Sequence, residues 1–415
     1  MAPRSASRAT SIAGAPFLAE HGLQSLIEAV AIEGTKVRIV GGAVRNHLLG
    51  VPVSDIDLAT DARPEVVTAR SEAAGFKVHP TGIDHGTLTV VAKGRPFEIT
   101  TLRSDISTDG RRATVAYSTD WIVDATRRDF TMNAIYADAD GTLFDPVGGV
   151  EDAYHRRVRF IGSPADRIAE DYLRILRFFR FHAAYGEGAI DAEGLSASIR
   201  ARHGFDVLSR ERIGQEMHKL VVARRAAETL ALMQLCGLLG PVIAGIGRPA
   251  VLGRLLEGLR EAGQRPDPML ALGALAVFSE TDADRVTDRL RLSRQECAFL
   301  AALPPLARSL GPRPMPHALR VAVYRHGNRL AEAALRLASA MEAVAVEADR
   351  LAIAATWAAP KFPLSGGDLL AAGCKPGPLL GKSLKSLEEK WISSDFRDVP
   401  PVEFLPFSEE VKARS

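Results

Sequence analysis

The stretch RIVGGAVRNHLLGVPVSDIDLATDARPE, residues 38–65, combines a β-like run, a glycine pair, an arginine and two closely spaced aspartates. The glycines at 41 and 42 let the backbone approach a ligand, and a helix starting there would present unpaired N–H groups to a phosphate. Arg45 adds a forked cation that suits phosphate oxygens. The stretch therefore predicts a strand, a turn and a helix with phosphate-binding chemistry. A Gly-Gly turn before a helix is, however, more often simple punctuation.

The two aspartates form an Asp-x-Asp pattern. If residues 56–58 are a strand, Asp55 and Asp57 point to the same face, roughly 6 to 7 Å apart. Such a pair can share the Mg²⁺ ions that hold a nucleoside triphosphate during nucleotidyl transfer. Glu98, in the β-like run PFEITTL, could complete the metal site or accept the proton of an attacking hydroxyl. Each pattern alone fits a solvated turn or strand, so only their combination favours a site.

Two further clusters contain several arginines. Arg127 and Arg128, in DATRRDFTMNAIYAD, would neutralise a triphosphate, or else form weak surface ion pairs. In RIAEDYLRILRFFRFHAAYG a charged residue recurs every third position, at Asp171, Arg174 and then Arg177 and Arg180. If this segment is one continuous helix, each step turns back about 60°, so Asp171 and Arg174 share a face.

An Asp–Arg pair of this spacing is usually a modest helix salt bridge. Directed into a pocket, the same pair would read a base. The carboxylate of Asp171 accepts from the exocyclic amine of cytosine or adenine, and Arg174 donates to the neighbouring ring nitrogen. Guanine and uracil present a carbonyl at that place, so the pair would select C and A.

The chain has 415 residues, which is more than a single core usually supports, and a formal net charge of +2. Residues 37–150 alternate short β-like runs with turns, whereas apolar residues from about 165 onwards recur at helical spacing. The predicted fold class is therefore an α/β head with a small mixed sheet, followed by an all-α remainder. The low net charge argues against non-specific coating of nucleic acid.

Three cysteines lie far apart in the sequence and fit reduced core thiols, and no apolar run is long enough for a membrane span. The first fifteen residues lack acidic side chains. They could be a weak transit peptide, although a short disordered tail is the commoner interpretation.

Six motifs occur in order over residues 35–220: GGAVR, DID, EITTLR, RRDFTMNAI, EDYLRILRFFRF and SRERIGQE. Their order and spacing resemble the class II tRNA nucleotidyltransferases, which are the CCA-adding enzymes, and their relatives the bacterial poly(A) polymerases. A weaker resemblance to the tail of bacterial members covers 365–396. The resemblance implies a leading segment at 1–34, a nucleotidyltransferase head at 35–155, a helical neck at 156–220, a helical body at 221–310 and a tRNA-binding helical tail at 311–415.

The resemblance also implies a role for each matching residue. Gly42 and Arg45 match triphosphate-contacting positions, and Arg128 matches a nucleotide-binding arginine. Asp55, Asp57 and Glu98 match the catalytic carboxylates, of which the two aspartates bind metal. Asp171 and Arg174 match the amino-acid template that reads the base, and Arg177 and Arg180 match further nucleotide-binding arginines. Arg212 and Glu216 match a motif that supports the base-reading helix.

The activity implied is template-independent addition of CCA to the 3′ end of tRNA, from CTP and ATP with Mg²⁺ as cofactor and pyrophosphate as leaving group. Poly(A) polymerase and an A-only enzyme remain alternatives. A CC-only enzyme is disfavoured because residues 103–121 resemble the flexible loop that A-adding members keep. A catalytically silent RNA-binding module is disfavoured because all three carboxylates are present. No HD phosphohydrolase cluster is visible in the C-terminal half.

Three further expectations concern context. The family motif GGxVRD ends here in Asn46, which should tune activity without abolishing it. Basic residues such as Arg156, Arg157, Arg159, Arg200 and Arg202 are candidates for contact with the RNA backbone. The bacterial-like tail and the Ala/Arg-rich composition favour a bacterial cytoplasmic location over a mitochondrial one. The sequence leaves open whether the protein is a monomer or a homodimer.

Overall fold

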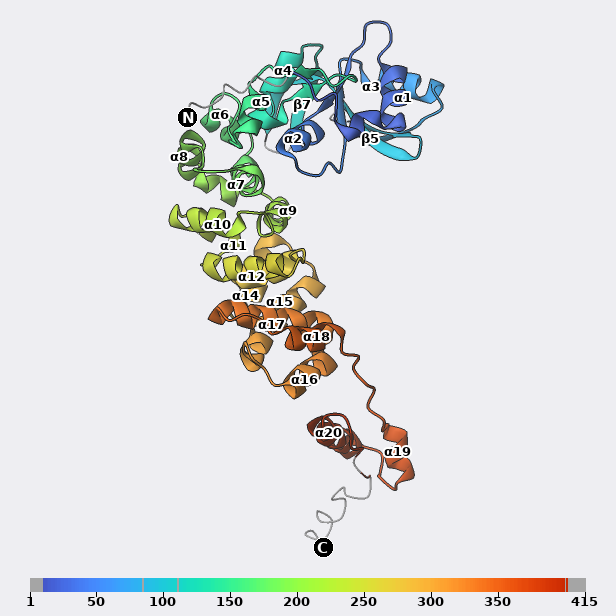
Figure 1. Cartoon of the computed structure of the whole chain (residues 1–415), viewed down its shortest axis with the longest axis vertical. Helices are drawn as coiled ribbons and strands as arrows, with labels where there is room; N and C mark the ends of the chain where they lie inside the picture. The colour runs from blue at the N-terminus through green and yellow to red at the C-terminus, as the bar shows by residue number, and fades with distance from the viewer. Residues whose placement is uncertain (1–9, 84–85, 110–111, 400, 402–415) are drawn as a thin grey trace. The chain divides into compact units, whose positions relative to one another are not determined.

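The computed structural model describes residues 10–83, 86–109, 112–399 and 401 (Figure 1). Its contacts divide the chain into two compact units. One unit contains residues 1–247 with 289–291, and the other contains 248–288 with 292–415. The first unit begins with the mixed sheet and continues into helices, and the second is helical, which confirms the predicted fold class. The boundaries predicted between head, neck, body and tail stay predictions.

The described part of the head contains a seven-stranded sheet with the order β3-β4-β5-β2-β1-β8-β9. Neighbouring strands pair antiparallel, except that β2 runs parallel to β5. The strands are β1 (Val37–Val40), β2 (Asp57–Thr60), β3 (Lys77–Gly82), β4 (Thr87–Ala92), β5 (Arg95–Thr101), β8 (Tyr136–Ala137) and β9 (Leu143–Phe144). Central β1 is buried along its whole length, whereas β4 alternates between buried and half-buried residues as a strand with one covered face does.

Helices cover the sheet and its edges. α1 (His21–Val30) packs on β1 and β4, and α3 (Pro64–Ala73) packs on α1, β3 and β4. α2 (Gly42–Leu49) packs against β1, the short helix η3 (Thr131–Asn133) and α5 (Gly149–Tyr154).

The segment expected as a flexible loop contains the strands β6 (Arg103–Asp109) and β7 (Arg112–Tyr117), which pair with each other in a separate two-stranded sheet. α4 (Trp121–Thr126) follows and contacts β6.

The rest of the first unit is helical. Its described helices are α6 (Pro164–Glu170), α7 (Leu173–Tyr185), α8 (Ala192–Arg200), η4 (Arg202–Asp206), α9 (Arg210–Leu220), α10 (Ala226–Leu235) and α11 (Leu239–Ile243). An aromatic cluster joins α7 to the head: Phe130 lies 5.0 Å from both Phe160 and Phe181 between ring centroids, and Phe160 stacks on Phe178 at 5.2 Å. Aromatic pairs at these distances add about 0.5–1.5 kcal/mol each beyond their burial, so α7 is fixed firmly to the head.

The second unit is built from α12 (Pro249–Glu261), α13 (Pro268–Ala276), most of α14 (Glu280–Leu290), α15 (Arg294–Leu310), α16 (Pro316–His326), α17 (Asn328–Glu342), α18 (Ala348–Thr356), α19 (Gly366–Ala371) and α20 (Pro378–Ser393). Leucine and alanine side chains of α12, α13, α15 and α17 share one core. A smaller core around Leu369, Cys374 and Leu387 joins α19 to α20. No helix within the described ranges is both long enough and apolar enough to cross a membrane.

We predict that His182, near the end of α7, stays neutral at pH 5. Burial lowers its pKa from 6.5 to about 4, and the neighbouring Arg225 and Arg224 lower it while Glu228 opposes them. Because the unfolded chain binds this proton more readily than the native one, His182 makes the protein less stable as the pH falls from about 6.5 towards 4. A histidine NMR titration, with the signal assigned through His182→Phe, measures the pKa directly. A titration midpoint above 6 would contradict the prediction.

Candidate active site

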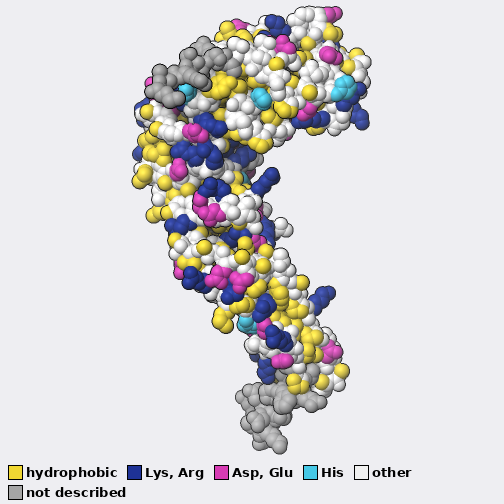
Figure 2. All heavy atoms as spheres, in the orientation of Figure 1, with side chains coloured by type: hydrophobic (Ala, Val, Ile, Leu, Met, Phe, Trp, Pro, Cys, Tyr) yellow, Lys and Arg dark blue, Asp and Glu magenta, His cyan; other side chains and the backbone are white. Residues whose placement is uncertain are grey.

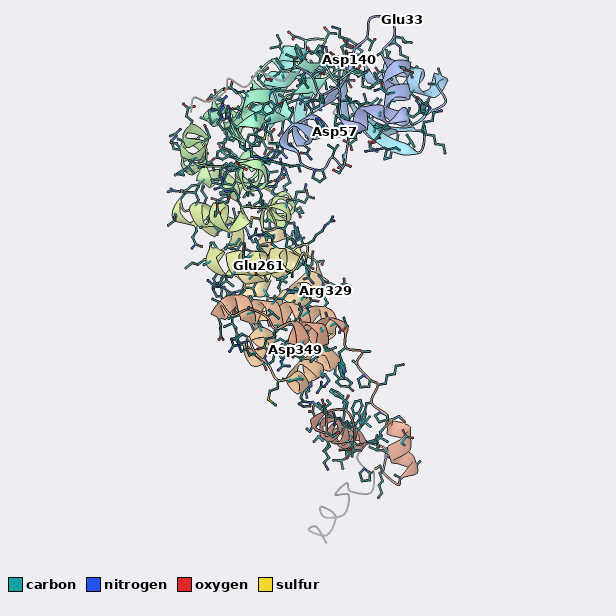
Figure 3. The ribbon with its side chains drawn as sticks, viewed as in Figure 1. Glu33, Asp57, Asp140, Glu261, Arg329 and Asp349 are labelled. Atoms are coloured by element: carbon teal, nitrogen blue, oxygen red, sulfur yellow. The ribbon has the colours of Figure 1, made fainter. Side chains whose placement is uncertain are left out.

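Strand register explains why the glycine pair and the Asp-x-Asp pattern are close in sequence. Val40, the last residue of β1, pairs with Asp57, the first residue of β2. Asp57 in turn pairs with Glu98 on the parallel strand β5. The turn that follows Val40 therefore leaves the sheet beside Asp57, with Glu98 one strand further on. Figure 3 labels Asp57 on the head.

The turn itself requires glycine at its first position. Gly41 has φ +69° and ψ −112°, a conformation that side-chain-bearing L-residues rarely adopt. Its N–H donates to the carbonyl of Ile135 at 3.1 Å, and its carbonyl accepts from the N–H of Arg45 at 2.9 Å. Gly42 then begins α2, which confirms the helix predicted after the glycine pair. The strand register places the N-terminus of this helix beside Asp57.

The three predicted carboxylates differ in exposure. Asp57 is half-buried, whereas Asp55 and Glu98 are exposed. Since β2 begins at Asp57, Asp55 lies just before the strand and accepts a hydrogen bond from Ser54 at 2.9 Å. The strand thus begins one residue later than the predicted 56–58, and Asp55 lies two residues ahead of it.

Burial raises the pKa of Asp57, and the nearby charges of Glu98 and Asp55 raise it further, while Arg128 and Arg45 lower it. A bound cation would relieve this repulsion. Within the described residues, no group of three or more His, Cys, Asp or Glu side chains is arranged to hold a metal. Mg²⁺ needs no such group, because it is commonly bound by one or two carboxylates together with water and substrate phosphates. The carboxylates of Asp55 and Asp57 fit that donor set.

A cavity of about 490 Å³ opens at this edge of the sheet. Eight of the residues that match the family's site positions line it: Gly42, Arg45, Asp57, Arg128, Asp171, Arg174, Arg177 and Arg180. Gly41, Arg127, Asp129, Asn133 and Phe181 complete the lining. Asp55, Glu98, Arg212 and Glu216 are not part of it. The cavity thus brings the glycine turn, one carboxylate and the arginine clusters together.

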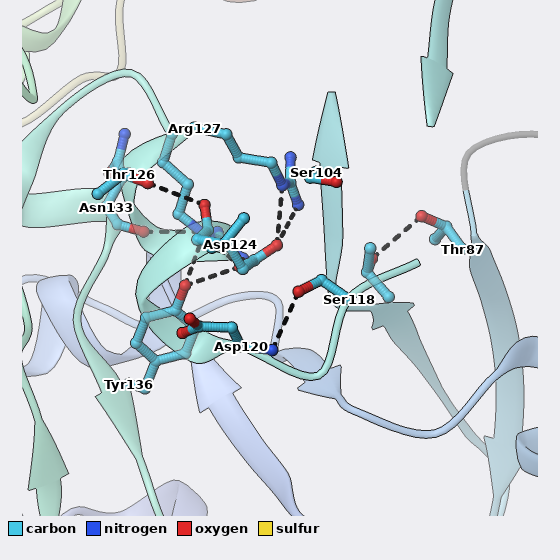
Figure 4. Close-up of polar contacts among 12 residues, drawn as sticks. Thr87, Ser104, Ser118, Asp120, Asp124, Thr126, Arg127, Asn133 and Tyr136 are labelled. Carbon is cyan, nitrogen blue, oxygen red and sulfur yellow. Dashed lines mark hydrogen bonds and ion pairs between the residues drawn. The ribbon is translucent and has the colours of Figure 1, made fainter. Parts of the chain in front are cut away.

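A buried carboxylate that the sequence analysis did not single out holds the first arginine cluster. Asp124, 1% exposed, accepts from Arg127 at 2.5 Å and from Arg128 at 3.0 Å. The hydroxyl of Tyr136 donates to it at 2.7 Å (Figure 4). Although burial opposes ionisation, Arg128 and Arg127 hold the pKa of Asp124 below its ordinary value. The buried carboxylate of Asp124 therefore fixes the positions of Arg127 and Arg128.

Asp129 likewise holds an arginine of α7 in place through an ion pair. It is buried, and its carboxylate accepts from Arg177 at 2.5 Å and from the amide of Asn133 at 2.9 Å. The side-chain oxygen Oδ1 of Asn133 accepts from Arg45 at 2.5 Å. A continuous chain of hydrogen bonds thus runs from α7 through Asp129 and Asn133 to α2. Asp129 and Asn133 both lie in the motif RRDFTMN, but the sequence does not show which residues they contact. Their role could therefore not be predicted from it.

The prediction of one continuous helix through Asp171 is wrong. α6 ends at Glu170, Asp171 is extended at φ −156° and ψ 107°, and α7 starts at Leu173. The carboxylate of Asp171 accepts from the N–H of Leu173 at 3.1 Å, as a residue ahead of a helix can. Its other oxygen accepts from Arg212 at 2.6 Å.

Asp171 and Arg174 both line the cavity, and they do not form the helix salt bridge that was the alternative to base reading. Arg174 instead donates to Glu170 and to the carbonyl of Arg167. Each member of the predicted base-reading pair is held by a different partner, so each is oriented independently. An ionised carboxylate has about four lone-pair sites, and Asp171 uses two of them in these bonds.

Glu216, on α9, supports the middle of α7. Its carboxylate is buried, pairs with Arg180 at 2.5 Å and lies 3.8 Å from Arg177. Together with Arg212 on Asp171, these contacts make α9 the element that supports the start and the middle of the predicted reading segment. This geometry agrees with the supporting role expected for Arg212 and Glu216, which stays a proposal.

Several candidate RNA contacts are engaged within the protein. Arg157 and Arg159 both pair with Asp152, which is fully buried. Arg156 donates to the carbonyl of Leu49 at 2.8 Å. These contacts assign the three arginines a structural role in joining α5 to its surroundings.

Asn46 shows what the departure from GGxVRD does in this chain. Its side-chain oxygen accepts from two nitrogens of Arg45, at 2.8 and 3.1 Å. Its amide nitrogen donates to the carbonyl of Pro52 at 3.0 Å, in the loop that leads to Asp55. A carboxylate could make the first contact but not the second.

The adjacent ends of β1 and β2 join a glycine turn to an Asp-x-Asp pair, beside a cavity lined by arginines. This combination defines a nucleotidyltransferase of the polymerase-head type. Residues 37–159 match the family model described as the poly A polymerase head domain. The mitochondrial CCA tRNA nucleotidyltransferase 1 of Danio rerio is 35% identical over 405 residues, covering 91% of this chain and 88% of that protein. The corresponding protein of Homo sapiens is 34% identical, covering 91% and 87%.

Among solved structures, the CCA-adding enzyme of Bacillus stearothermophilus in complex with CTP aligns with a TM-score of 0.73 at 27% identity, covering 90% of this chain and 93% of that one. The chain therefore belongs to the family of CCA tRNA nucleotidyltransferases, the CCA-adding enzymes, as the six motifs indicated. It is an enzyme, and the cofactor that its family implies is a divalent metal ion.

The comparisons contradict the expected bacterial cytoplasmic location. The relatives from Danio rerio and Homo sapiens, at 35% and 34% identity over 91% of the chain, are mitochondrial by name and point to a mitochondrial location. The expectation rested on composition and on a tail segment. Neither acts as a targeting signal, which is why they misled.

We predict that Asp124→Ala destabilises the first unit by about 3–5 kcal/mol, because it leaves two arginines and a tyrosine hydroxyl without their buried partner. Asp120→Ala, at the exposed N-cap of the same helix, should cost only about 1 kcal/mol. Urea unfolding followed by circular dichroism measures both variants. Equal losses in the two variants would contradict the buried network.

We predict that Asn46→Asp raises the divalent-metal concentration needed for half-maximal activity about fivefold, since one hydrogen bond to the loop before Asp55 is worth about 1 kcal/mol. Asn328→Asp is the control, because the Asn328 amide also donates to backbone carbonyls but lies in the second unit. Titrating Mg²⁺ at saturating nucleotide checks the prediction. An unchanged Mg²⁺ requirement in Asn46→Asp would show that the Pro52 contact does not support the metal site.

Proposed function

We propose that this enzyme restores the 3′ terminus of tRNA by adding C, C and A in turn from CTP and ATP, without a nucleic-acid template. The observation that carries the proposal is the 490 Å³ cavity. It combines Asp57 of the metal-type pair, the arginines suited to phosphate, and Asp171 and Arg174 suited to a base.

In the proposed reaction the terminal ribose hydroxyl of tRNA attacks the α-phosphorus of the nucleotide. The bond from that phosphorus to the bridging oxygen breaks, and pyrophosphate leaves. Arg45 and Arg128 hold the triphosphate beside the N-terminus of α2, and the exposed Glu98 accepts the hydroxyl proton. Asp55 and Asp57 would hold Mg²⁺, which supplies charge neutralisation at the attacking and leaving oxygens when bound.

The base is read by amino-acid side chains in this proposal. Asp171 accepts from the exocyclic amine of cytosine or adenine, and Arg174 donates to the adjacent ring nitrogen. Uracil and guanine carry a carbonyl in place of that amine and would leave one acceptor facing another. Because Arg212 and Glu170 hold the two side chains separately, the pair can be kept in position before a nucleotide enters.

Support for CCA addition over poly(A) addition comes from the relatives. The matched head model carries a poly(A) polymerase description, but the relatives that align over most of the chain are named for CCA addition. The similar solved enzyme from Bacillus stearothermophilus is bound to CTP, which a polymerase of adenosine alone would not use. Contacts to tRNA would depend on local basic clusters, since acidic and basic side chains are interspersed over the face in Figure 2.

The test is nucleotide incorporation into three tRNAs that end before CCA, after C and after CC. Each reaction contains Mg²⁺ and one labelled nucleotide, and product lengths are read on a gel. We expect C, C and A to be added in order, followed by a stop. Long A tails without C would make the enzyme a poly(A) polymerase, and binding of tRNA without incorporation would make it a silent module.

Asp57→Asn should abolish incorporation, because it removes a carboxylate of the metal-type pair. A loss of about 10³-fold or more is expected for a group that stabilises charge in the transition state. Asp140→Asn is the matched control, since Asp140 is an exposed aspartate of the same unit outside the cavity. Retention of more than a tenth of the activity in Asp57→Asn would contradict the assignment.

A further inference from the structure

Arg45 is the most enclosed of the arginines assigned to phosphate. It is 7% exposed, and three partners from three elements bind its guanidinium: Asn46 on α2, Asn133 on η3 and Tyr185 at the end of α7. Because a guanidinium is planar, contacts made in its plane leave its two faces open to rings. Aromatic rings that pack on these faces therefore help to set the orientation of the guanidinium plane of Arg45.

Tyr185 provides the nearest ring. The guanidinium carbon of Arg45 lies 4.3 Å from the centroid of the Tyr185 ring and 5.2 Å from that of Phe181. Arg45 also donates to the Tyr185 hydroxyl at 3.0 Å. The two rings themselves are in contact, 5.5 Å apart.

Tyr185 does not line the cavity, whereas Phe181, four residues earlier on α7, does. Any effect of Tyr185 on a bound nucleotide must therefore pass through residues that it contacts. Of these, Arg45 and Phe181 line the cavity, and Arg45 carries the charge suited to phosphate. α7 also carries Arg174, Arg177 and Arg180 into the cavity. Tyr185, the last residue of α7, thus contacts Arg45, which is assigned to phosphate. The first turn of the same helix carries Arg174, which is assigned to the base.

We propose that Tyr185 is a positioning residue that fixes Arg45 for the triphosphate and so links phosphate binding to the base-reading helix. The proposal rests on the function proposed above. Since every nucleotide has the same triphosphate, loss of Tyr185 weakens CTP and ATP equally and leaves base selection unchanged. This pattern distinguishes Tyr185 from Asp171 and Arg174, whose loss would change selection.

The test compares KM and kcat for CTP and for ATP in Tyr185→Leu, Tyr185→Phe and the wild type. Loss of the ring and its hydroxyl should raise KM for both nucleotides about tenfold, with a smaller change in kcat. Tyr185→Phe keeps the ring and should stay within about threefold of the wild type. Tyr154→Leu, which replaces a half-exposed tyrosine on α5, is the matched control and should behave as the wild type.

A double-mutant cycle with Arg45→Lys separates positioning from general destabilisation. If Tyr185 acts through Arg45, Tyr185→Leu should add less than threefold to KM once Arg45 is lysine. Fully additive effects, an unchanged KM in Tyr185→Leu, or a rise for one nucleotide only would overturn the inference. An inactive wild type would instead refute the proposed function, so the two failures are distinguishable.

Discussion

Mutual repulsion among arginines is the constraint on which the site depends. Six of them, at 45, 127, 128, 174, 177 and 180, line a cavity of about 490 Å³. Protein carboxylates balance five of the six. Asp124 binds Arg127 and Arg128, Asp129 binds Arg177, and Glu170 binds Arg174. Glu216 binds Arg180 and also lies 3.8 Å from Arg177. The carboxylates hold the guanidiniums apart and in fixed orientations. A polyanionic ligand can then bind to a site whose charges are already arranged.

The same carboxylates join the elements of the first unit. Asp129 connects the segment after α4 to α7, and Glu216 connects α9 to α7. The aromatic cluster around Phe130 reinforces the first connection. The contacts that orient the arginines in the cavity are therefore also the contacts that hold α7 in place.

Much of this arrangement could be predicted from the sequence, because it depends on local rules. The glycine pair, the strand before it and the helix after it were readable from residue type alone. Asp57 was correctly placed at a strand, since alternation of apolar residues marks short strands well. The change from mixed sheet to helices also follows from the periodicity of the chain.

The remaining features depend on tertiary contacts. The helix break at Asp171 was missed because charged residues every three positions mimic an uninterrupted helix, although an aspartate ahead of an apolar run is also a helix-start signal. Asp124 was missed because its neighbours WIV and AT give no sign that it is buried under two arginines. The register of Asp57 with Glu98 depends on a parallel pairing between strands that are distant in sequence, which no local pattern specifies.

The most direct measurement of the central claim is the ratio of kcat/KM for CTP to that for UTP, on a tRNA that ends before CCA, in the wild type and in Asp171→Ala. If the protein reads the base, the ratio should fall about 10- to 100-fold in Asp171→Ala, because the group that accepts from the cytosine amine is gone. Asp166→Ala, in the preceding helix, should leave the ratio unchanged. A variant Asp171→Ala that loses rate but keeps the full preference for CTP would contradict the account.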